Sequence, residues 1–163
     1  MINIRHANED DLPAMLAIYN DIILNTTAVW HNEPHTLEMR KEWFALKKEQ
    51  KHPVFVAEED GSLVGFSTIG SFRPWPGYRF TVENSVYVAA GSRGKGIAKL
   101  LIPPLIAAAK ELNLHAIVAG IEATNDASIG LHKKFGFIEV AHFKEIGYKF
   151  DRWMDLKFLE LIL

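Results

Sequence analysis

Residues 81–99 read Thr81-Val-Glu-Asn-Ser-Val-Tyr-Val-Ala-Ala-Gly-Ser-Arg-Gly-Lys-Gly-Ile-Ala-Lys99. A β-rich run over 81–90 is followed by a basic, glycine-rich turn over 91–96 and by an apolar helical pattern that begins near Ile97. Strand, glycine turn and helix in this order bind a phosphate, because glycines let the backbone approach closely and the first helical amides point at the anion. The stretch therefore predicts a site for a phosphorylated cofactor. Arg93 and Lys95 add positive charge, and Glu83 supplies a carboxylate nearby.

Length and composition restrict what the rest of the chain can be. The 163 residues are enough for one domain with a substantial core, and we predict a single domain over 1–163. A net charge of -2 gives no basic field for nucleic acid, and no apolar run is long enough to cross a bilayer. The first residues are typical of a strand and not of a signal peptide, so we expect a cytoplasmic protein. The absence of cysteine excludes disulfides and thiol catalysis.

Periodicity predicts the element order β-α-α-β-β-β-α-β-α-β-β. Early strands are joined by short turns such as Asp60-Gly61 and later strands by helices, so we expect an α/β protein with a mixed sheet and helices on both faces. The charges of the second helix, from Thr36 to about Lys51, suit a solvated face. Pro103-Pro104 predicts a bend in the third helix or an interruption that resumes at Leu105. Strands are expected at 2–5, 53–59, 63–69, 81–90, 114–121, 137–141 and 152–161.

The turn also carries a family resemblance. The segment Arg93-Gly-Lys-Gly96-Ile-Ala98 resembles the acetyl-CoA signature Arg/Gln-x-x-Gly-x-Gly/Ala of the GNAT acetyltransferase superfamily. Asn125 and residues 131–137 look like that family's second helix and following strand. Nearly the whole chain is similar to the phosphinothricin / methionine sulfoximine acetyltransferase branch, through Tyr19-Asn20, Thr27-Ala28, Phe72-Arg73, residues 81–88, Asn125, Ser128, Leu131-His132 and Trp153-x-Asp155.

The resemblance implies a GNAT-like acyl-CoA N-acyltransferase fold, with a mostly antiparallel central sheet flanked by helices. It implies acetyl-CoA as cosubstrate, no metal, and a homodimer. The implied reaction transfers acetyl to the α-amino group of a glutamate- or methionine-like amino acid, such as methionine sulfoximine, methionine sulfone or phosphinothricin. Two rival functions stay open: acetylation of another amine (a polyamine, an aminoglycoside or a protein amino terminus) and non-catalytic binding of acetyl-CoA.

Amides of the glycine turn are expected to hold the CoA pyrophosphate, helped by the helix dipole. If a bulge interrupts the strand, free backbone groups at 86–88 would pair with the pantetheine arm as an added strand does. The alternatives are an ordinary basic turn and, for Asn125, a simple N-cap. The expected cofactor-binding residues are Val86, Tyr87, Val88, Arg93, Gly94, Lys95, Gly96, Ile97, Ala98, Lys99, Asn125 and Ser128.

Two residues are candidates for acid–base catalysis. Strand alternation places Glu83, Ser85 and Tyr87 on one face and Asn84 on the other. Glu83 is predicted to take the proton of the substrate ammonium; the alternative is a solvated Glu83 or one paired with Arg79. His132 occupies the slot where many relatives carry a tyrosine that protonates the departing thiolate. It is expected to donate that proton, contact substrate or orient the base, or else to be an ordinary surface histidine.

A loop rich in proline and aromatic residues precedes the organising strand, and its arginine suits a substrate carboxylate. The alternative is a packed loop with an exposed arginine. His31 and His35 are four residues apart but lack a third ligand, so no metal site is predicted. The expected substrate-binding residues are Arg73, Pro74, Trp75, Tyr78, Glu83, Asn84, Ser85, Tyr19 and Thr27.

Overall fold

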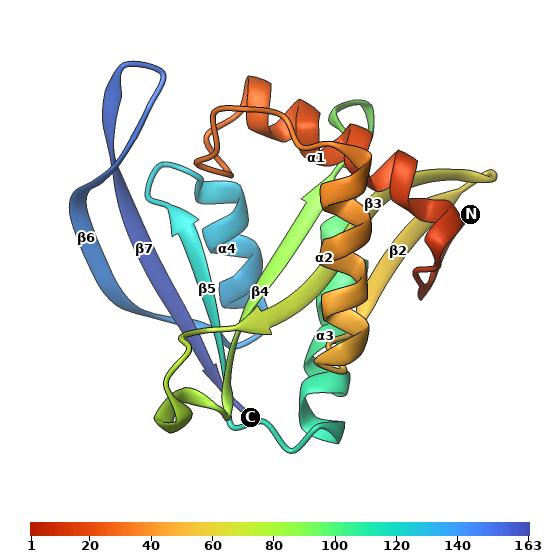
Figure 1. Cartoon of the computed structure of the whole chain (residues 1–163). Helices are drawn as coiled ribbons and strands as arrows, with labels where there is room; N and C mark the ends of the chain where they lie inside the picture. Colours follow the sequence, from red (N-terminus) through yellow and green to blue (C-terminus); the bar gives the residue numbers. More distant parts are fainter.

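The computed structural model describes residues 1–163, which form one seven-stranded sheet with helices on both faces (Figure 1). The strands are β1 (Ile2–His6), β2 (Val54–Glu59), β3 (Ser62–Ser71), β4 (Thr81–Val88), β5 (Ala116–Glu122), β6 (Ile138–Lys149) and β7 (Arg152–Ile162). The helices are α1 (Leu12–Asn25), α2 (Leu37–Glu49), α3 (Ile97–Glu111) and α4 (Asp126–Lys134), with short 3-10 turns η1 (Glu9–Asp11), η2 (Pro76–Tyr78) and η3 (Ala90–Ser92).

The strand order is β1-β2-β3-β4-β5-β7-β6, and only the β4–β5 pair is parallel. This confirms the predicted element order and the mixed, mostly antiparallel sheet. The Asp60-Gly61 hairpin is also confirmed, since both residues have positive φ, as a two-residue hairpin turn requires. No helix combines the length and apolar character that crossing a bilayer requires.

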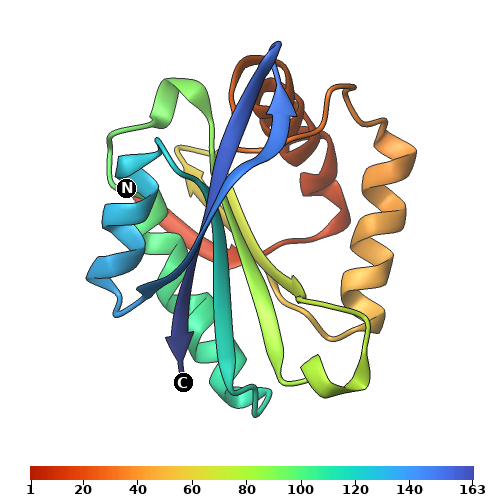
Figure 2. The same cartoon turned by 90° about the vertical axis from the view of Figure 1, so that its left-hand side faces the viewer.

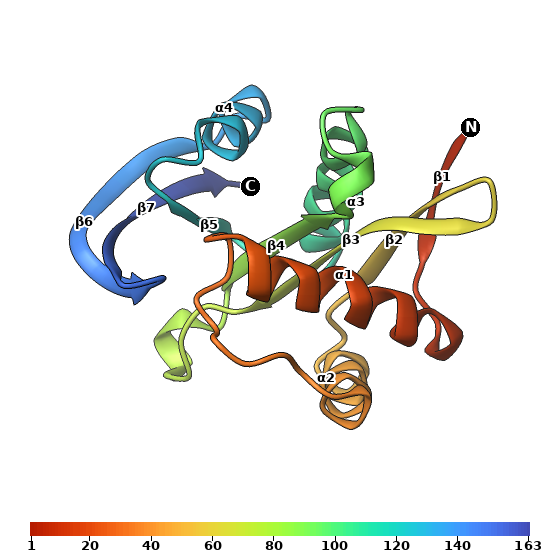
Figure 3. The ribbon, with the colours of Figure 1, turned by 90° about the horizontal axis from the view of Figure 1, so that it is seen from above.

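Helices cover both faces of the sheet (Figure 3), and each face has its own apolar core. On one face α1 and α2 pack Met15 and Phe44 against Phe66 of β3. On the other face α3 packs Leu101 and Leu105 against the sheet, and α4 contributes Ile129. The central strands are therefore buried on both sides, and a polar side chain on one of them must face a cavity or a partner.

Strands β4 and β5 pair at three positions and then separate. The pairs are Thr81 with Ala116, Val82 with Ile117, and Glu83 with Val118. Beyond Glu83 the two strands diverge (Figure 1), so one edge of β4 has no neighbouring strand over 84–88. The β3–β4 register is uninterrupted, so the free backbone groups at 86–88 arise from this divergence and not from a bulge.

Helix α3 runs without a break through Pro103 and Pro104, so the interruption considered from the sequence is wrong. The two prolines cannot donate to the carbonyls of Lys99 and Leu100, one turn earlier. Lys99, Leu100 and Pro103 are exposed, so this side of the helix is open to solvent, which can supply donors to carbonyls that lack an intrahelical partner. The opposite side is buried along its length, and its packing keeps the helix continuous.

The predicted strand 137–141 ends too early. Strand β6 continues to Lys149 and forms a long hairpin with β7 that extends beyond the rest of the sheet (Figure 2). A register shift between Phe143 and Gly147 hides the alternation. The turn uses Phe150 and Asp151, both with positive φ, where glycine or asparagine would have marked it in the sequence.

The β6–β7 hairpin is tied to the end of α1. The buried Lys149 ammonium donates to the carbonyl oxygens of Ile23 at 2.5 Å, Thr26 at 2.8 Å and Val29 at 2.6 Å. A cation at this position satisfies carbonyls that the helix end leaves free. The contact fixes the path of the chain from α1 into the loop that follows.

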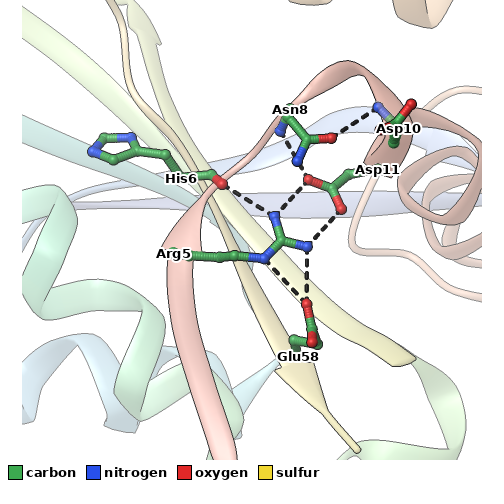
Figure 4. Close-up of polar contacts among 6 residues, drawn as sticks. All are labelled: Arg5, His6, Asn8, Asp10, Asp11 and Glu58. Atoms are coloured by element: carbon green, nitrogen blue, oxygen red, sulfur yellow. Dashed lines mark hydrogen bonds and ion pairs between the residues drawn. The ribbon is translucent and has the colours of Figure 1, made fainter. Parts of the chain in front are cut away.

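A charged cluster fixes the opposite end of the molecule (Figure 4). The Arg5 guanidinium donates to both carboxylate oxygens of Asp11 at 2.8 Å and to Glu58 at 2.9 Å. Asp11 also accepts from the backbone amide of Asn8, which caps η1. The bidentate pair therefore joins β1, β2 and the start of α1.

Replacing Asp11 with Asn is expected to lower the free energy of unfolding at pH 7 by about 1–3 kcal/mol, because Arg5 loses its main partner. Hydrogen bonding to Arg5 holds the pKa of Asp11 below its usual range. The contribution is therefore complete above about pH 4 and is lost as the pH falls through the lowered pKa. Urea denaturation at pH 7 and below pH 3 should show the difference shrinking, with the exposed Asp10→Asn as control.

Candidate active site

Glu83 stands where β4 and β5 begin to separate. Its side chain borders both the opening between the strands and a cavity on the α1–α2 face. Gly120 of β5 makes room for it: a methyl group added there would lie 2.7 Å from Glu83 Oε1. Burial raises the pKa of the Glu83 carboxyl above its ordinary value. A carboxylate with a raised pKa, open to two cavities, is suited to accept a proton near neutral pH.

The cavity on the α1–α2 face, here called the α2 cavity, has a volume of about 530 Å³. Glu83, Ser85 and Tyr87 enter it from β4, which confirms the predicted alternation, and Tyr19 enters from α1. The remaining wall comes from α2 and β3 and includes Arg40, Trp43, Lys47 and Thr68. The space suits a small molecule whose reacting group lies at Glu83.

A second space, here called the β4–β5 groove, follows the divergence of the strands to the start of α3, with a volume of about 890 Å³. At its end Gly94 and Gly96 have φ of 76° and 80°, a conformation that favours glycine. The amides from Gly94 to Ala98 donate to no backbone carbonyl. These free donors at a helix N-terminus fit a pyrophosphate. The groove is lined by Val86, Tyr87, Val88, Arg93, Gly94, Gly96, Ile97, Ala98, Lys99, Asn125 and Ser128, but not by Lys95.

Two of the predicted cofactor-binding residues, Arg93 and Asn125, make polar contacts with other residues of the chain. Arg93 Nε donates to the Val88 carbonyl at 3.3 Å, and its guanidinium lies 3.6 Å from the Asp21 carboxylate, so it bridges β4 and α1. Asn125 accepts from the Ser128 amide at 3.2 Å and is the N-cap of α4. The capping role of Asn125 is thus present alongside its place in the groove wall.

His132 is buried, with 4% of its surface exposed, so it is not a surface histidine. Its Nδ1 lies 2.8 Å from the Ser128 carbonyl and must carry the proton, so Nε2 accepts from the Asn84 side-chain amide at 3.0 Å. Burial lowers the pKa of the ring. The histidine is therefore neutral with both nitrogens occupied. Both ring nitrogens are engaged within the protein, which disfavours donating a proton to the thiolate, while contacting the substrate and orienting the base stay predictions.

The loop expected to bind the substrate starts at the α2 cavity, which Ser71 lines, but its predicted substrate residues lie outside both cavities. Arg73, Pro74, Trp75 and Tyr78 are exposed and line neither the α2 cavity nor the β4–β5 groove. The Arg73 guanidinium lies 5.3 Å from the centre of the Phe72 ring. Thr27 borders the β4–β5 groove and not the α2 cavity. Within this chain, the predicted substrate residues that meet are Tyr19, Glu83 and Ser85, with Asn84 behind them.

The prediction of a solvated face on α2 is wrong for two residues. Arg40 and Lys47 are buried and line the α2 cavity. The signal was present in the sequence, because Arg40, Phe44 and Lys47 have the i, i+4, i+7 spacing of an inward face. Charged residues are rarely buried unless they are paired, so charged residues at inward positions call for a partner or a ligand.

The rings of His31 and His35 meet edge to face with their centres 4.9 Å apart, and His35 borders the α2 cavity. No group of three or more His, Cys, Asp or Glu side chains is arranged to hold a metal ion.

Known proteins resemble this chain over almost its whole length. The L-methionine sulfoximine/L-methionine sulfone acetyltransferase of Pseudomonas paraeruginosa is 45% identical over 162 residues, which cover 99% of this chain and 94% of that protein. A crystal structure described as a ribosomal-protein-alanine N-acetyltransferase of Brucella melitensis is 48% identical, with a TM-score of 0.97 and 99% of both chains covered.

A crystal structure of a phosphinothricin acetyltransferase from Sinorhizobium meliloti contains acetyl-CoA. It is 31% identical, with a TM-score of 0.96, over 99% of this chain and 88% of that one. The model of the acetyltransferase (GNAT) domain matches residues 4–157. These matches confirm the resemblance carried by the 93–98 turn: the chain belongs to the GNAT acetyltransferase family.

Proposed function

We propose that the protein is an acetyl-CoA-dependent N-acetyltransferase that acts on the α-amino group of a glutamate- or methionine-like amino acid. The observation that carries the proposal is the position of Glu83, a half-buried carboxylate that lines both the α2 cavity and the opening between β4 and β5. The names of the Pseudomonas and Sinorhizobium relatives support methionine sulfoximine, methionine sulfone and phosphinothricin as substrates.

Each part of the site has a role in direct transfer. Bound acetyl-CoA supplies the thioester carbonyl that the amine attacks. The free amides at 94–98 hold the pyrophosphate, and the unpaired edge of β4 over 86–88 aligns the pantetheine arm and polarises the carbonyl. Glu83 takes the proton that the substrate ammonium must lose before its nitrogen can attack. As the N–C bond forms, the C–S bond of the thioester would break, and the CoA thiolate would leave and be neutralised by the proton that the attacking nitrogen then loses. His132 keeps Asn84 in place behind the base.

The description of the Brucella relative favours a second candidate, acetylation of a protein amino terminus. The size of the α2 cavity, about 530 Å³, suits a free amino acid better than a folded protein's terminus.

Steady-state acetylation rates for a panel of amines test which class of acceptor the enzyme prefers. The panel holds methionine sulfoximine, methionine sulfone, phosphinothricin, the common amino acids, spermidine, an aminoglycoside and a peptide that begins with alanine. The highest kcat/KM is expected for the amino-acid analogues. A clear preference for the peptide or spermidine would overturn the proposal. Binding of acetyl-CoA without CoA release for any amine tested would indicate a non-catalytic binding module.

We further propose that the protein is a cytoplasmic homodimer that associates through the β6–β7 hairpin. Acetyl-CoA is produced inside the cell, and this hairpin exposes large apolar side chains, including Ile146, Tyr148 and Trp153, the last 63% exposed. Sedimentation should give twice the monomer mass, and Trp153→Glu should shift the molecule toward monomer. A monomeric wild type at micromolar concentration would contradict the proposal.

A further inference from the structure

Helix α2 brings two cations, Arg40 and Lys47, into the α2 cavity, and neither forms an ion pair with a carboxylate. Arg40 is 3% exposed and Lys47 is 8% exposed. The Arg40 guanidinium lies 4.3 Å from the ring centre of Tyr19 and 4.6 Å from that of Trp43, and its Nε has no hydrogen-bond partner. The Lys47 ammonium donates to the Ile69 carbonyl at 2.5 Å, which leaves two of its donors free.

Leaving such groups without a counter-ion is costly, because a buried charge loses its hydration and is stable only when paired. Burial lowers the pKa of both residues, that of Lys47 to about 8. No carboxylate contributes to the pKa of either group. Two carboxylates border the cavity: Glu83, in its wall, and Glu42, exposed at its rim.

The geometry of α2 places the two cations on one side of the helix. They are seven residues apart, two turns or about 10 Å along the axis, and both lie close to the Trp43 ring. The same cavity reaches Glu83 on β4. A ligand that carries a carboxylate close to its amine, as an α-amino acid does, would place the amine at Glu83 and supply an anion to the cations of the same cavity.

We propose that Arg40 and Lys47 form an anion subsite for the carboxylate of the substrate, while its amine lies at Glu83. This inference rests on the proposed amino-acid acetyltransferase activity and names the residues that select an acidic acceptor. It differs from the expectation drawn from the sequence, in which Arg73 holds the carboxylate, because Arg73 lies outside the cavity.

The test compares L-methionine sulfone with its carboxamide, which lacks the negative charge. The variants are Arg40→Met and Lys47→Gln; the glutamine keeps an N–H donor for Ile69. Each is expected to raise the KM for methionine sulfone roughly 10- to 100-fold, the loss of one charge-assisted hydrogen bond. The KM values for the carboxamide and for acetyl-CoA should stay within about twofold of wild type. Lys48→Met is the matched control, since Lys48 is exposed and pairs with Glu9.

Phosphinothricin adds a second arm, because it carries a side-chain phosphinate as well as the α-carboxylate. A larger KM increase for phosphinothricin than for methionine sulfone in Lys47→Gln would place the phosphinate at Lys47. Equal increases would place the α-carboxylate there. Either result supports an anion subsite on α2.

Stability separates this role from a structural one. If Lys47 only supports the fold, Lys47→Gln should melt at a lower temperature and leave the ratio of the two KM values unchanged. If the cation serves the substrate, the variant should be at least as stable as wild type at pH 7, because a buried unpaired charge has been removed. Should Arg40→Met not fold, Lys47→Gln alone decides.

The subsite alone would be overturned if the wild type acetylates amino acids and the α2 variants keep the wild-type ratio of the KM values for methionine sulfone and its carboxamide. A matching KM increase in Arg73→Met, with α2 variants unaffected, would restore the assignment to Arg73. A wild type that acetylates no amino acid would overturn the proposed function, and the subsite with it.

Discussion

Glu83→Gln is expected to lower kcat about 10²- to 10⁴-fold, while the KM for acetyl-CoA changes little. The glutamine has nearly the same shape but cannot accept the ammonium proton. Glu83 lines the α2 cavity and the opening between β4 and β5 but not the β4–β5 groove that ends at the pyrophosphate turn, so coenzyme binding should survive. Steady-state kinetics with both substrates varied, together with calorimetric titration of CoA, would measure the two effects separately.

The pH profile offers an internal check on this assignment. Burial raises the pKa of Glu83, so wild-type kcat/KM should fall as the pH drops through that raised value, and this limb should be absent in Glu83→Gln. With a folded-state pKa above the unfolded one, ionised Glu83 costs stability at neutral pH. The variant should therefore unfold at no lower urea concentration than wild type. A fully active variant would exclude Glu83 as the base.

Gly120→Ala is expected to lower kcat on the order of 10²-fold without touching the chemistry directly. The new methyl group would lie 2.7 Å from Glu83 Oε1 and 3.2 Å from a ring carbon of Phe158, so the carboxylate must move. A displacement of about 1 Å in a reacting group has this effect on rate. Crowding against Phe158 should also lower the free energy of unfolding by about 1–3 kcal/mol. Kinetics and urea denaturation would measure both.

A double variant distinguishes displacement of the base from general damage. In the Glu83→Gln background the base is already absent, so adding Gly120→Ala should lower kcat little further. If the decrease in kcat of the double variant equals the product of the decreases in the two single variants, Gly120 does not act through Glu83.

The elements that hold the coenzyme could be predicted from the sequence because their signals are local. Glycines at 94 and 96 fix the turn, the apolar pattern starts α3 at Ile97, and alternation along 81–88 gives the face on which Glu83 lies. Each depends on residues adjacent in the chain, where conformational preference and periodicity act directly.

The acceptor side depends on contacts between distant segments, and there prediction was weaker. Lys47 is buried against Ile69, and Arg40 against Tyr19, so neither burial follows from the charge pattern of α2 alone. The full length of β6 was missed because its turn uses Phe150 and Asp151 in a conformation that these residues adopt only under the constraint of paired strands. Arg73 was predicted to bind the substrate carboxylate because of its residue type, but the fold places it outside both cavities.

The three hydrogen bonds from Lys149 to backbone carbonyls bear on the design of shortened variants of this protein. The hairpin looks like an appendage in Figure 2, yet its last β6 residue fastens the segment that carries Thr26, Thr27 and Ala28 into the wall of the β4–β5 groove. A truncation that removes Lys149 is expected to remove these hydrogen bonds and to free one wall of the groove, although Lys149 and Val29 are 120 residues apart in the chain. Truncations there belong among the changes that weaken coenzyme affinity.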